Sequence, residues 1–327
     1  MRETAQSVTV TTLAKFEHPD ITAKGEPRAT VPLERLQTVW FNTGTLCNIT
    51  CTNCYIESSP TNDRLAYIGA EEVVTLLDEL ISGQHRTEEI GFTGGEPFMN
   101  PEFLAMLGAA LDRRFDVLVL TNAMQPLQRG PIKKGLIELK EKHGARLRLR
   151  ISLDHFTRDL HEAERGPKTF DKAIAGIDWL NAQGFEIAIA GRTCWNEDER
   201  EARNGYAALV ASRGWRIDPA NPKQLMLLPE MDGSHEVPEI SAACWGILKK
   251  SPNQMMCATS RMVVKRKGAA KPTVLPCTLL PYEPAFEMGG TFAEAARADD
   301  GMFTDGAVKL CHPHCAKFCV LGGGSCS

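Results

Sequence analysis

Three cysteines stand within eight residues in the stretch Cys47-Asn48-Ile49-Thr50-Cys51-Thr52-Asn53-Cys54, spaced C-x3-C-x2-C. They follow the apolar run Val39-Trp40-Phe41, so the sequence predicts a strand that ends in a cysteine-rich loop. Three thiolates can hold a cubane of four irons, and because the cubane needs four outer ligands, one iron stays open. An open coordination position is typical of catalytic metal sites. The alternative is a zinc site, but no further Cys or His lies within the next 30 residues.

A second motif, Gly94-Gly95-Glu96-Pro97, follows the next predicted strand. Two glycines let the backbone approach a ligand closely, and a carboxylate beside them can pair with an ammonium group. Alone, such a stretch would usually be a turn before a helix. One strand after a cysteine loop, it indicates a binding site shared by the two segments.

The two motifs together resemble the signature of the radical S-adenosylmethionine (radical SAM) superfamily. The resemblance implies that Cys47, Cys51 and Cys54 hold a [4Fe–4S] cluster, and that SAM chelates the open iron through its amino and carboxylate groups. Residues 94–97 would bind SAM. In that family the reduced cluster cleaves SAM to methionine and a 5′-deoxyadenosyl radical, which abstracts hydrogen from the substrate. The resemblance also implies an electron donor of the flavodoxin or ferredoxin type.

Further cofactor-binding positions carry over from the family, and they lie at the ends of later strands: Thr121, Asn122, Ser152, Asp154, Arg192 and Leu228. The first pair matches a stretch near the amino acid part of SAM, and the second pair matches polar contacts to the ribose. The arginine suits the SAM carboxylate and the leucine suits the adenine. One position departs from the family, because Asn53 stands where an aromatic residue usually covers the adenine. Tyr55 lies on the other side of Cys54.

Seven of the eleven cysteines crowd the last third of the chain. They resemble the SPASM or shorter twitch extensions of radical SAM enzymes, which hold one or two auxiliary [4Fe–4S] clusters, although the spacings differ from the usual pattern. The implied ligands are Cys257, Cys277, Cys311, Cys315, Cys319 and Cys326, with Cys244 as a further candidate for a second cluster. Zinc is the alternative, and His312 and His314 would be convenient ligands for it.

Three more residues are candidates for chemistry on position alone. Cys194, just beyond the fifth strand, is either a small buried hydrophobe or a donor of a hydrogen atom to a substrate radical, as in some radical SAM epimerases. Glu230 and Asp232 follow the sixth strand and are candidate acid–base groups.

The elements that position these residues alternate between strands and helices, which predicts a parallel sheet with right-handed crossovers. The predicted strands span residues 38–44, 89–95, 116–122, 147–154, 186–193 and 224–230, and the predicted helices span 70–82, 101–113, 132–143, 170–183 and 197–213. The fold class is therefore α/β, and the resemblance makes it a partial (β/α)6 TIM-type barrel with a small cysteine-rich C-terminal extension. The predicted domains are an irregular lead-in at 1–36, the barrel at 37–230 and an auxiliary-cluster domain at 231–327. Within the last of these, 262–264 and 274–275 flank a basic turn, expected to be solvated, as in a hairpin.

Composition narrows the function. The chain has 327 residues, 43% of them hydrophobic and 24% charged, with a net charge of −4. This charge predicts no attraction to nucleic acid or to an anionic membrane. The N-terminus lacks an apolar signal sequence and no run is long enough to span a bilayer, so we expect a cytoplasmic protein without a disulfide framework.

The predicted function is that of a radical SAM enzyme that oxidises, or forms a bond within, a small-molecule or peptide substrate with the help of an auxiliary cluster. Two other reactions stay open within the family, epimerisation and a GTP-cyclase-like step of cofactor biosynthesis. The closely spaced C-terminal cysteine pair of the GTP cyclases is absent, since Cys257 and Cys277 are far apart. The alternative from another class is a non-catalytic iron–sulfur electron carrier or a zinc-stabilised binding protein.

Overall fold

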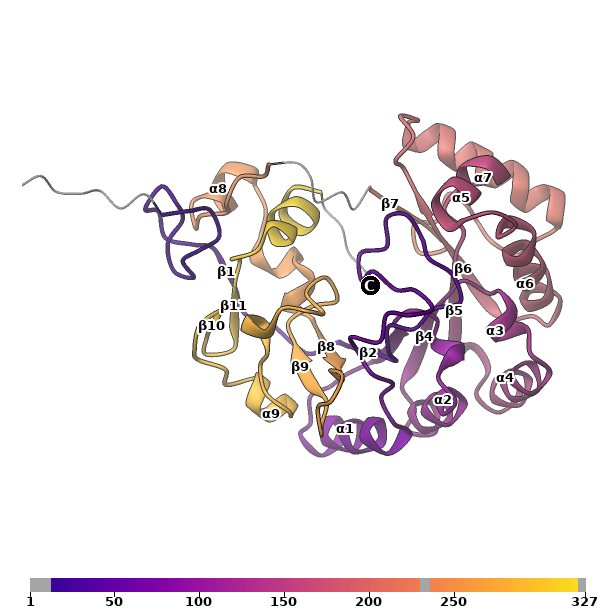
Figure 1. Cartoon of the computed structure of the whole chain (residues 1–327), viewed down its shortest axis with the longest axis horizontal. Helices are drawn as coiled ribbons and strands as arrows, with labels where there is room; N and C mark the ends of the chain where they lie inside the picture. The colour runs from indigo at the N-terminus through magenta and orange to yellow at the C-terminus, as the bar shows by residue number, and fades with distance from the viewer. Residues whose placement is uncertain (1–12, 230–235, 323–327) are drawn as a thin grey trace, which may run out of the picture.

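The computed structural model describes residues 13–229 and 236–322. Its main feature is an eight-stranded sheet with the strand order β7-β6-β5-β4-β3-β2-β8-β9. Strands β2 to β7 are parallel to one another, and Figure 1 shows them curled into an incomplete barrel with the larger helices on its outer face. The predicted α/β partial barrel is confirmed. The barrel strands are β2 Thr38–Asn42, β3 Glu89–Thr93, β4 Asp116–Thr121, β5 Leu147–Ser152, β6 Glu186–Arg192 and β7 Leu225–Leu228.

The helices of the barrel follow the predicted pattern. Helix α1 has the predicted bounds, because a stripe of apolar residues at helical spacing faces the sheet and is buried. Each such side chain contributes about 1.5–3 kcal/mol when it is fully buried. Two further helices, α3 and α5, were not predicted, because they are short and α5 is charged on most of its positions. The helices are α1 Ala70–Ser82, α2 Phe103–Asp112, α3 Gln125–Gln128, α4 Gly130–His143, α5 Arg158–Arg165, α6 Phe170–Ala182 and α7 Glu199–Arg213.

The C-terminal region is joined to the barrel through the sheet itself. The predicted hairpin is confirmed as β8 Ser260–Val264 and β9 Thr273–Leu275, paired antiparallel. Strand β8 also runs parallel to β2, with Thr38 opposite Ser260, so the hairpin continues the barrel sheet at its open edge. Besides short 3-10 turns, this region contains α8 Cys244–Leu248, α9 Phe292–Ala295, β10 Phe303–Thr304, β11 Ala307–Lys309 and a π-helical segment Cys315–Leu321.

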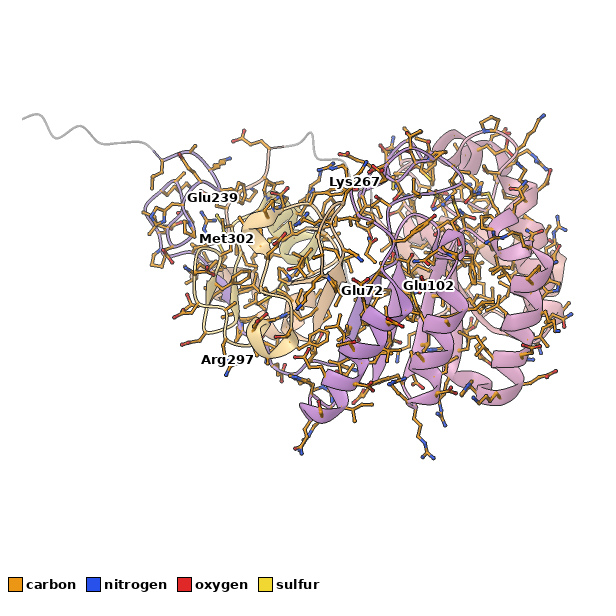
Figure 2. The ribbon with its side chains drawn as sticks, turned by 60° about the horizontal axis from the view of Figure 1, so that its bottom comes forward. Glu72, Glu102, Glu239, Lys267, Arg297 and Met302 are labelled. Atoms are coloured by element: carbon orange, nitrogen blue, oxygen red, sulfur yellow. The ribbon has the colours of Figure 1, made fainter. Side chains whose placement is uncertain are left out.

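The lead-in also packs against the C-terminal region (Figure 1). Its strand β1, Thr30–Val31, pairs with β11, and Ala29 N donates to Ile240 O at 2.9 Å. The basic turn is anchored rather than merely solvated, because Lys265 pairs with Glu72 at 2.7 Å and Lys267 pairs with Asp63 at 2.6 Å. Glu72 also accepts a hydrogen bond from Gly69 N at the start of α1. Figure 2 shows Glu72 near Glu102, with each residue at the end of its helix. The turn therefore fastens the hairpin to the barrel.

Two apolar cores hold the molecule together. The larger one lies between the sheet and its outer helices and extends into the C-terminal region. The smaller one fills the inside of the barrel beside the hairpin, and its buried members are Trp40, Leu65, Leu118, Met262, Val264 and Leu275. No helix in the described residues is long and apolar enough to cross a membrane.

Candidate functional site

The cysteine loop begins where β2 ends, and the Gly-Gly stretch holds its first residues. Gly95 N donates to Gly44 O at 2.9 Å and Glu96 N donates to Leu46 O at 3.1 Å. A Cβ atom on Gly94 would lie 2.5 Å from Gly44 O, and one on Gly95 would lie 2.2 Å from Leu46 O. The φ of Gly94 is +140°, a region that favours glycine. The two glycines thus let the β3 end pack directly against the loop that presents Cys47.

Glu96 lies beneath this contact rather than on the surface of the site. Its carboxylate is buried and accepts from Thr121 Oγ1 and from Asn122 N, both at 2.9 Å, and from Phe98 N at 3.3 Å. Burial raises the pKa of Glu96 to about 7, against the effect of these hydrogen bonds. Pro97 opens a buried 3-10 turn. In the structure, Glu96 and Pro97 join the end of β3 to the end of β4. Their expected contact with SAM stays a prediction.

A cavity of about 210 Å³ opens over the ends of the barrel strands. Its walls come from both the barrel and the C-terminal region, which contributes Met256, Leu279, Phe318 and Cys319. Most of the predicted site residues line it together: Cys47, Cys51, Cys54, Gly94, Gly95, Thr121, Asn122, Ser152, Asp154, Arg192 and Leu228. Glu96, Pro97 and Cys194 are not among the lining residues. Glu230 and Asp232 lie outside the described residues.

The three thiols of the loop have surroundings that suit iron–sulfur ligands, with burial at two of them and N–H groups beside the sulfurs. Burial raises the pKa of Cys47 to about 12, and it also raises the pKa of Cys51. Metal ligation requires thiolates, so binding would release protons here. N–H groups already point at the sulfurs: Asn122 Nδ2 lies 3.9 Å from Cys47 Sγ, and Ser58 N donates to Cys54 Sγ at 3.4 Å. Such donors favour a negatively charged sulfur.

Arg165, on the unpredicted helix α5, lines the same cavity. It forms a bidentate pair with Asp154, at 2.6 Å and 3.0 Å. Burial opposes the charge of Asp154, but Arg165 and Arg192 outweigh it and lower the pKa of this carboxyl. Burial likewise opposes the charge of Arg165, yet Asp154 and the nearby thiol of Cys51 raise its pKa. The site therefore has a fixed guanidinium beside the cysteines, which sequence reasoning missed because α5 has the composition of an ordinary surface helix.

Glu164, which precedes Arg165 on α5, explains why Asn53 stands where the family usually has an aromatic residue. Glu164 accepts from Asn53 N at 2.9 Å and from Asn53 Nδ2 at 3.0 Å, and its backbone carbonyl accepts from Thr52 N at 2.8 Å. Arg192 pairs with Glu164 at 3.3 Å and donates to Asn53 O at 3.1 Å. Asn53 thus fastens the cysteine loop to α5, and the aromatic residue of this loop that lines the cavity is Tyr55.

The C-terminal cysteines divide into two groups. Burial raises the pKa of Cys277 well above its usual range, and the neighbouring thiols Cys319, Cys315 and Cys257 raise it further. Burial likewise raises the pKa of Cys315, and the thiols of Cys257, Cys319 and Cys311 raise it further. We call Cys257, Cys277, Cys315 and Cys319 the four-thiol group, and Cys319 is its member that also lines the cavity.

The other predicted auxiliary ligands in the described residues have hydrogen-bond partners of their own. Cys311 Sγ donates to Phe16 O at 3.2 Å and to His18 O at 3.4 Å, and Cys244 lies 3.6 Å from Ser241 Oγ. Cys326 is outside the described residues. Within residues 13–229 and 236–322, no three His, Cys, Asp or Glu side chains converge closely enough to hold a single metal ion.

The two histidines proposed as zinc ligands contact each other and the backbone. His314 Nδ1 lies 3.1 Å from Leu279 O, and His312 Nδ1 accepts from His314 N at 3.1 Å. Burial lowers the pKa of His312 to about 4, and His314 lowers it further. Both rings are thus held as parts of the local packing.

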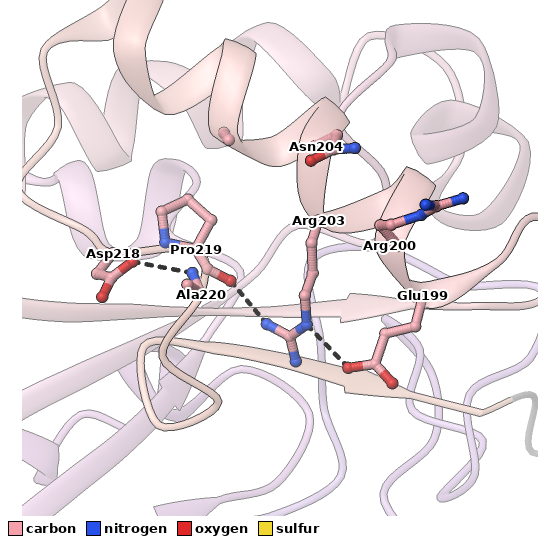
Figure 3. A pocket seen from close by; sticks show the side chains of 8 residues that line it. Glu199, Arg200, Arg203, Asn204, Asp218, Pro219 and Ala220 are labelled. Atoms are coloured by element: carbon pink, nitrogen blue, oxygen red, sulfur yellow. Dashed lines mark hydrogen bonds and ion pairs between the residues drawn. The ribbon is translucent and has the colours of Figure 1, made fainter.

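A second cavity, of about 550 Å³, lies on the outside of the barrel between α7 and residues 218–220 (Figure 3). Arg203 crosses it and is already engaged, since it donates to Glu199 at 2.8 Å and to Pro219 O at 2.7 Å. It contains none of the cysteines. The cavity over the strand ends is therefore the candidate active site.

Parallel strands that deliver three cysteines, a Gly-Gly turn and polar side chains to one end of a partial barrel define a class of metal-dependent α/β-barrel protein. The family model of the radical SAM superfamily matches residues 41–203. The chain belongs to the radical SAM superfamily, and the family resemblance of its motifs is confirmed.

Curated relatives and solved structures agree with this assignment. The antilisterial bacteriocin subtilosin biosynthesis protein AlbA of Bacillus subtilis is 29% identical over 171 residues, 52% of this chain and 35% of AlbA. The GTP 3′,8-cyclase of Ectopseudomonas mendocina is 31% identical over 163 residues, 47% of this chain and 45% of the cyclase. These matches thus span about a third to a half of the relatives' own length. The crystal structure of Streptococcus suis SuiB bound to S-adenosylmethionine has a TM-score of 0.59 at 13% identity, covering 84% of this chain and 68% of SuiB. The shared fold therefore extends beyond the region that the family model matches.

Proposed function

We propose that this protein is a radical SAM enzyme that uses the cavity over its strand ends to abstract hydrogen from a substrate. The observation that carries the proposal is that three cysteine thiols, both glycines of the Gly-Gly stretch and the polar ends of β4 to β6 line one cavity. When bound there, a [4Fe–4S] cluster and SAM would supply reductive cleavage of SAM to a 5′-deoxyadenosyl radical.

The residues of this chain have separate roles in that site. Cys47, Cys51 and Cys54 would hold the cluster. Asn122 links the loop to β4, since its side chain donates to Asn48 Oδ1 at 2.9 Å. Arg165, fixed by Asp154, offers a cation for the carboxylate of SAM or for the cluster charge.

The floor of the cavity supports a substrate with an acidic group. Arg150 and Ser152 both lie on β5 and both line the cavity. Arg150 comes two residues earlier, so it lies about 7 Å deeper along the strand. Its side chain is buried beside Met226, with Nη1 3.7 Å from Sδ. The cavity wall around this arginine also holds apolar side chains, Leu120, Met226 and Leu279 among them, and this mixture favours a ligand that combines a carboxylate with an apolar remainder. A peptide or a small organic acid has this chemistry. The peptide is supported by SuiB, whose structure bound to the precursor peptide SuiA has a TM-score of 0.58 at 13% identity, covering 82% of this chain and 66% of SuiB.

The four-thiol group supports one auxiliary [4Fe–4S] cluster in a SPASM- or twitch-like extension. Cys319 lies in the wall of the cavity, so an auxiliary cluster there could take an electron from a substrate radical directly. This arrangement favours an oxidative or bond-forming reaction. An epimerase of the expected kind is less supported, because Cys194 is not among the lining residues. We further propose a flavodoxin- or ferredoxin-type protein as the electron source.

Anaerobic reconstitution tests the proposal. The protein should bind more than four irons and convert SAM, with dithionite, to 5′-deoxyadenosine and methionine. Cys51→Ala should abolish the cleavage, whereas Thr52→Ala, which changes the next residue of the loop, should retain it. A fully loaded protein that leaves SAM intact would favour an electron carrier, and zinc in place of iron would favour a binding protein. Deuterium transfer from candidate acids and peptides into 5′-deoxyadenosine would then identify the substrate class.

A further inference from the structure

Arg261, on β8, is one of the largest fully buried side chains in the structure, with 1% of its surface exposed. Among the described residues, its guanidinium donates hydrogen bonds only to backbone carbonyls. Nη1 donates to Cys257 O at 2.6 Å and to Ser260 O at 2.8 Å, and Nη2 donates to Gly306 O at 3.3 Å. Nε is buried and has no hydrogen-bond partner there. Among the described residues, the ionisable groups that act on this arginine are Cys257 and Cys277, and no carboxylate is among them.

A charge in this position is costly unless an anion balances it. The penalty for burying an ion is several kcal/mol, and carbonyl dipoles offset only a part of it. Arg28 in the same region shows the usual solution. It is equally buried and also donates to carbonyls, but Glu239 pairs with it at 2.6 Å. Arg261 lacks such a partner, so its anion must come from another kind of group.

The ionisable groups next to Arg261 are thiols. Arg261 is in direct contact with one of them, since its Nη1 donates to the carbonyl of Cys257 at 2.6 Å, and the thiols of Cys257 and Cys277 are the ionisable groups that act on its charge. Both belong to the four-thiol group. Neutral thiols would not balance a guanidinium, but ligation to iron converts them to thiolates and makes the whole assembly negative.

We propose that Arg261 is the buried counter-cation of an auxiliary [4Fe–4S] cluster held by Cys257, Cys277, Cys315 and Cys319. This inference rests on the auxiliary-cluster part of the proposed function. A fixed positive charge stabilises the reduced cluster, which has gained one electron, more than the oxidised cluster. Because net charge and hydrogen bonds to sulfur set the potential of such clusters, Arg261 raises it. The cluster then accepts an electron from a substrate radical more readily.

The experiment isolates the auxiliary cluster in the full-length chain. Cys47, Cys51 and Cys54 are replaced together by Ala, so that iron taken up in anaerobic reconstitution reports on the C-terminal cysteines alone. In this background Arg261→Gln removes the charge and keeps hydrogen-bond donors, whereas Arg261→Lys keeps the charge and loses the planar fork. Arg28→Met is the control, because it removes an equally buried arginine that has its own carboxylate. Iron content and an EPR-monitored redox titration are measured for each protein.

The charge removed in Arg261→Gln should disfavour reduction of the cluster by at least tenfold, a shift of about 59 mV to more negative potential for a one-electron couple. Arg261→Lys should stay within threefold of the parent, and Arg28→Met should lower thermal stability without moving the potential. Loss of iron in the Gln variant with retention in the Lys variant also supports the proposal. Equal potentials for the parent, Lys and Gln proteins overturn it, as does loss of iron from both variants alike. A background protein that takes up no iron overturns it too. SAM plays no part in this measurement, so its result and the SAM-cleavage result can fail separately.

Discussion

Glu164 accepts two hydrogen bonds from Asn53, one from the backbone amide at 2.9 Å and one from the side-chain amide at 3.0 Å. The bonds join helix α5 to the residue that precedes the third cysteine of the loop. The side chain of Glu164 is 4% exposed, and Arg192 pairs with it at 3.3 Å. The shape of the cysteine loop therefore depends on a carboxylate that is distant in the sequence.

Glu164→Gln should loosen this loop. The amide group that replaces one carboxylate oxygen would face the N–H donors of Asn53, and a buried bond lost in this way costs about 1–3 kcal/mol. We expect lower iron content at the three-cysteine site and faster loss of iron on exposure to air. Glu162→Gln is the matched control on the same helix, since Glu162 pairs with Arg158 at 3.5 Å near the surface. Equal iron retention in the two variants would contradict the role of Glu164.

Gly95→Ala should damage the site without touching a cysteine. Its Cβ would lie 2.2 Å from Leu46 O and 2.7 Å from Thr45 O, and backbone atoms cannot move aside cheaply. We expect a destabilisation of at least about 2 kcal/mol, of the size seen for overpacking, measured by urea unfolding. Gly130→Ala is the control, because nothing lies within 4 Å of a Cβ there. An alanine at position 95 that unfolds like the wild type would show that the contact with the cysteine loop is not tight.

Glu96 makes the stability of the metal-free protein depend on pH. Its pKa is raised by burial from 4.5 to about 7, so between these values the native state holds a proton that the unfolded state has released. Stability therefore falls as the pH rises through this window, by at most roughly 3 kcal/mol. Glu96→Gln should remove this contribution. Urea unfolding from pH 4.5 to pH 8 should show the wild type losing stability relative to the variant. Curves that stay parallel would mean that Glu96 is ionised throughout.

Much of the barrel could be predicted because its signals are local. Residues 117–120 form a continuous apolar run, and α1 has its apolar residues at helical spacing, so each element is visible in a short window. The same holds for the cysteine loop and the Gly-Gly stretch, whose spacing is a property of the sequence.

What could not be predicted depends on contacts between distant segments. The pairing of Thr38 with Ser260 brings the C-terminal hairpin into the barrel sheet, and no local pattern marks it. The polar sequence of helix α5 is typical of a surface helix. In the fold, however, Glu164 is buried and Arg165 lines the same cavity as the cysteines. The contacts of the C-terminal cysteines are of the same kind, because Cys311 donates to the carbonyl of Phe16 in the lead-in, whereas the thiols of Cys257 and Cys319 act on nearby Cys315.

Arg165→Met tests whether the ion pair with Asp154 supports the site. Removing the guanidinium leaves a buried carboxylate whose remaining ion-pair partner, Arg192, is 3.7 Å away. Breaking a buried pair by removing one partner costs about 3–5 kcal/mol. We expect a loss of that size in urea unfolding of the metal-free protein, and weaker SAM binding by the reconstituted protein in calorimetry. Arg158→Met is the control on the same helix, because its pair with Asp171 at the surface contributes less than about 1 kcal/mol. If both variants are equally stable and bind SAM equally well, Arg165 has no special part in the site.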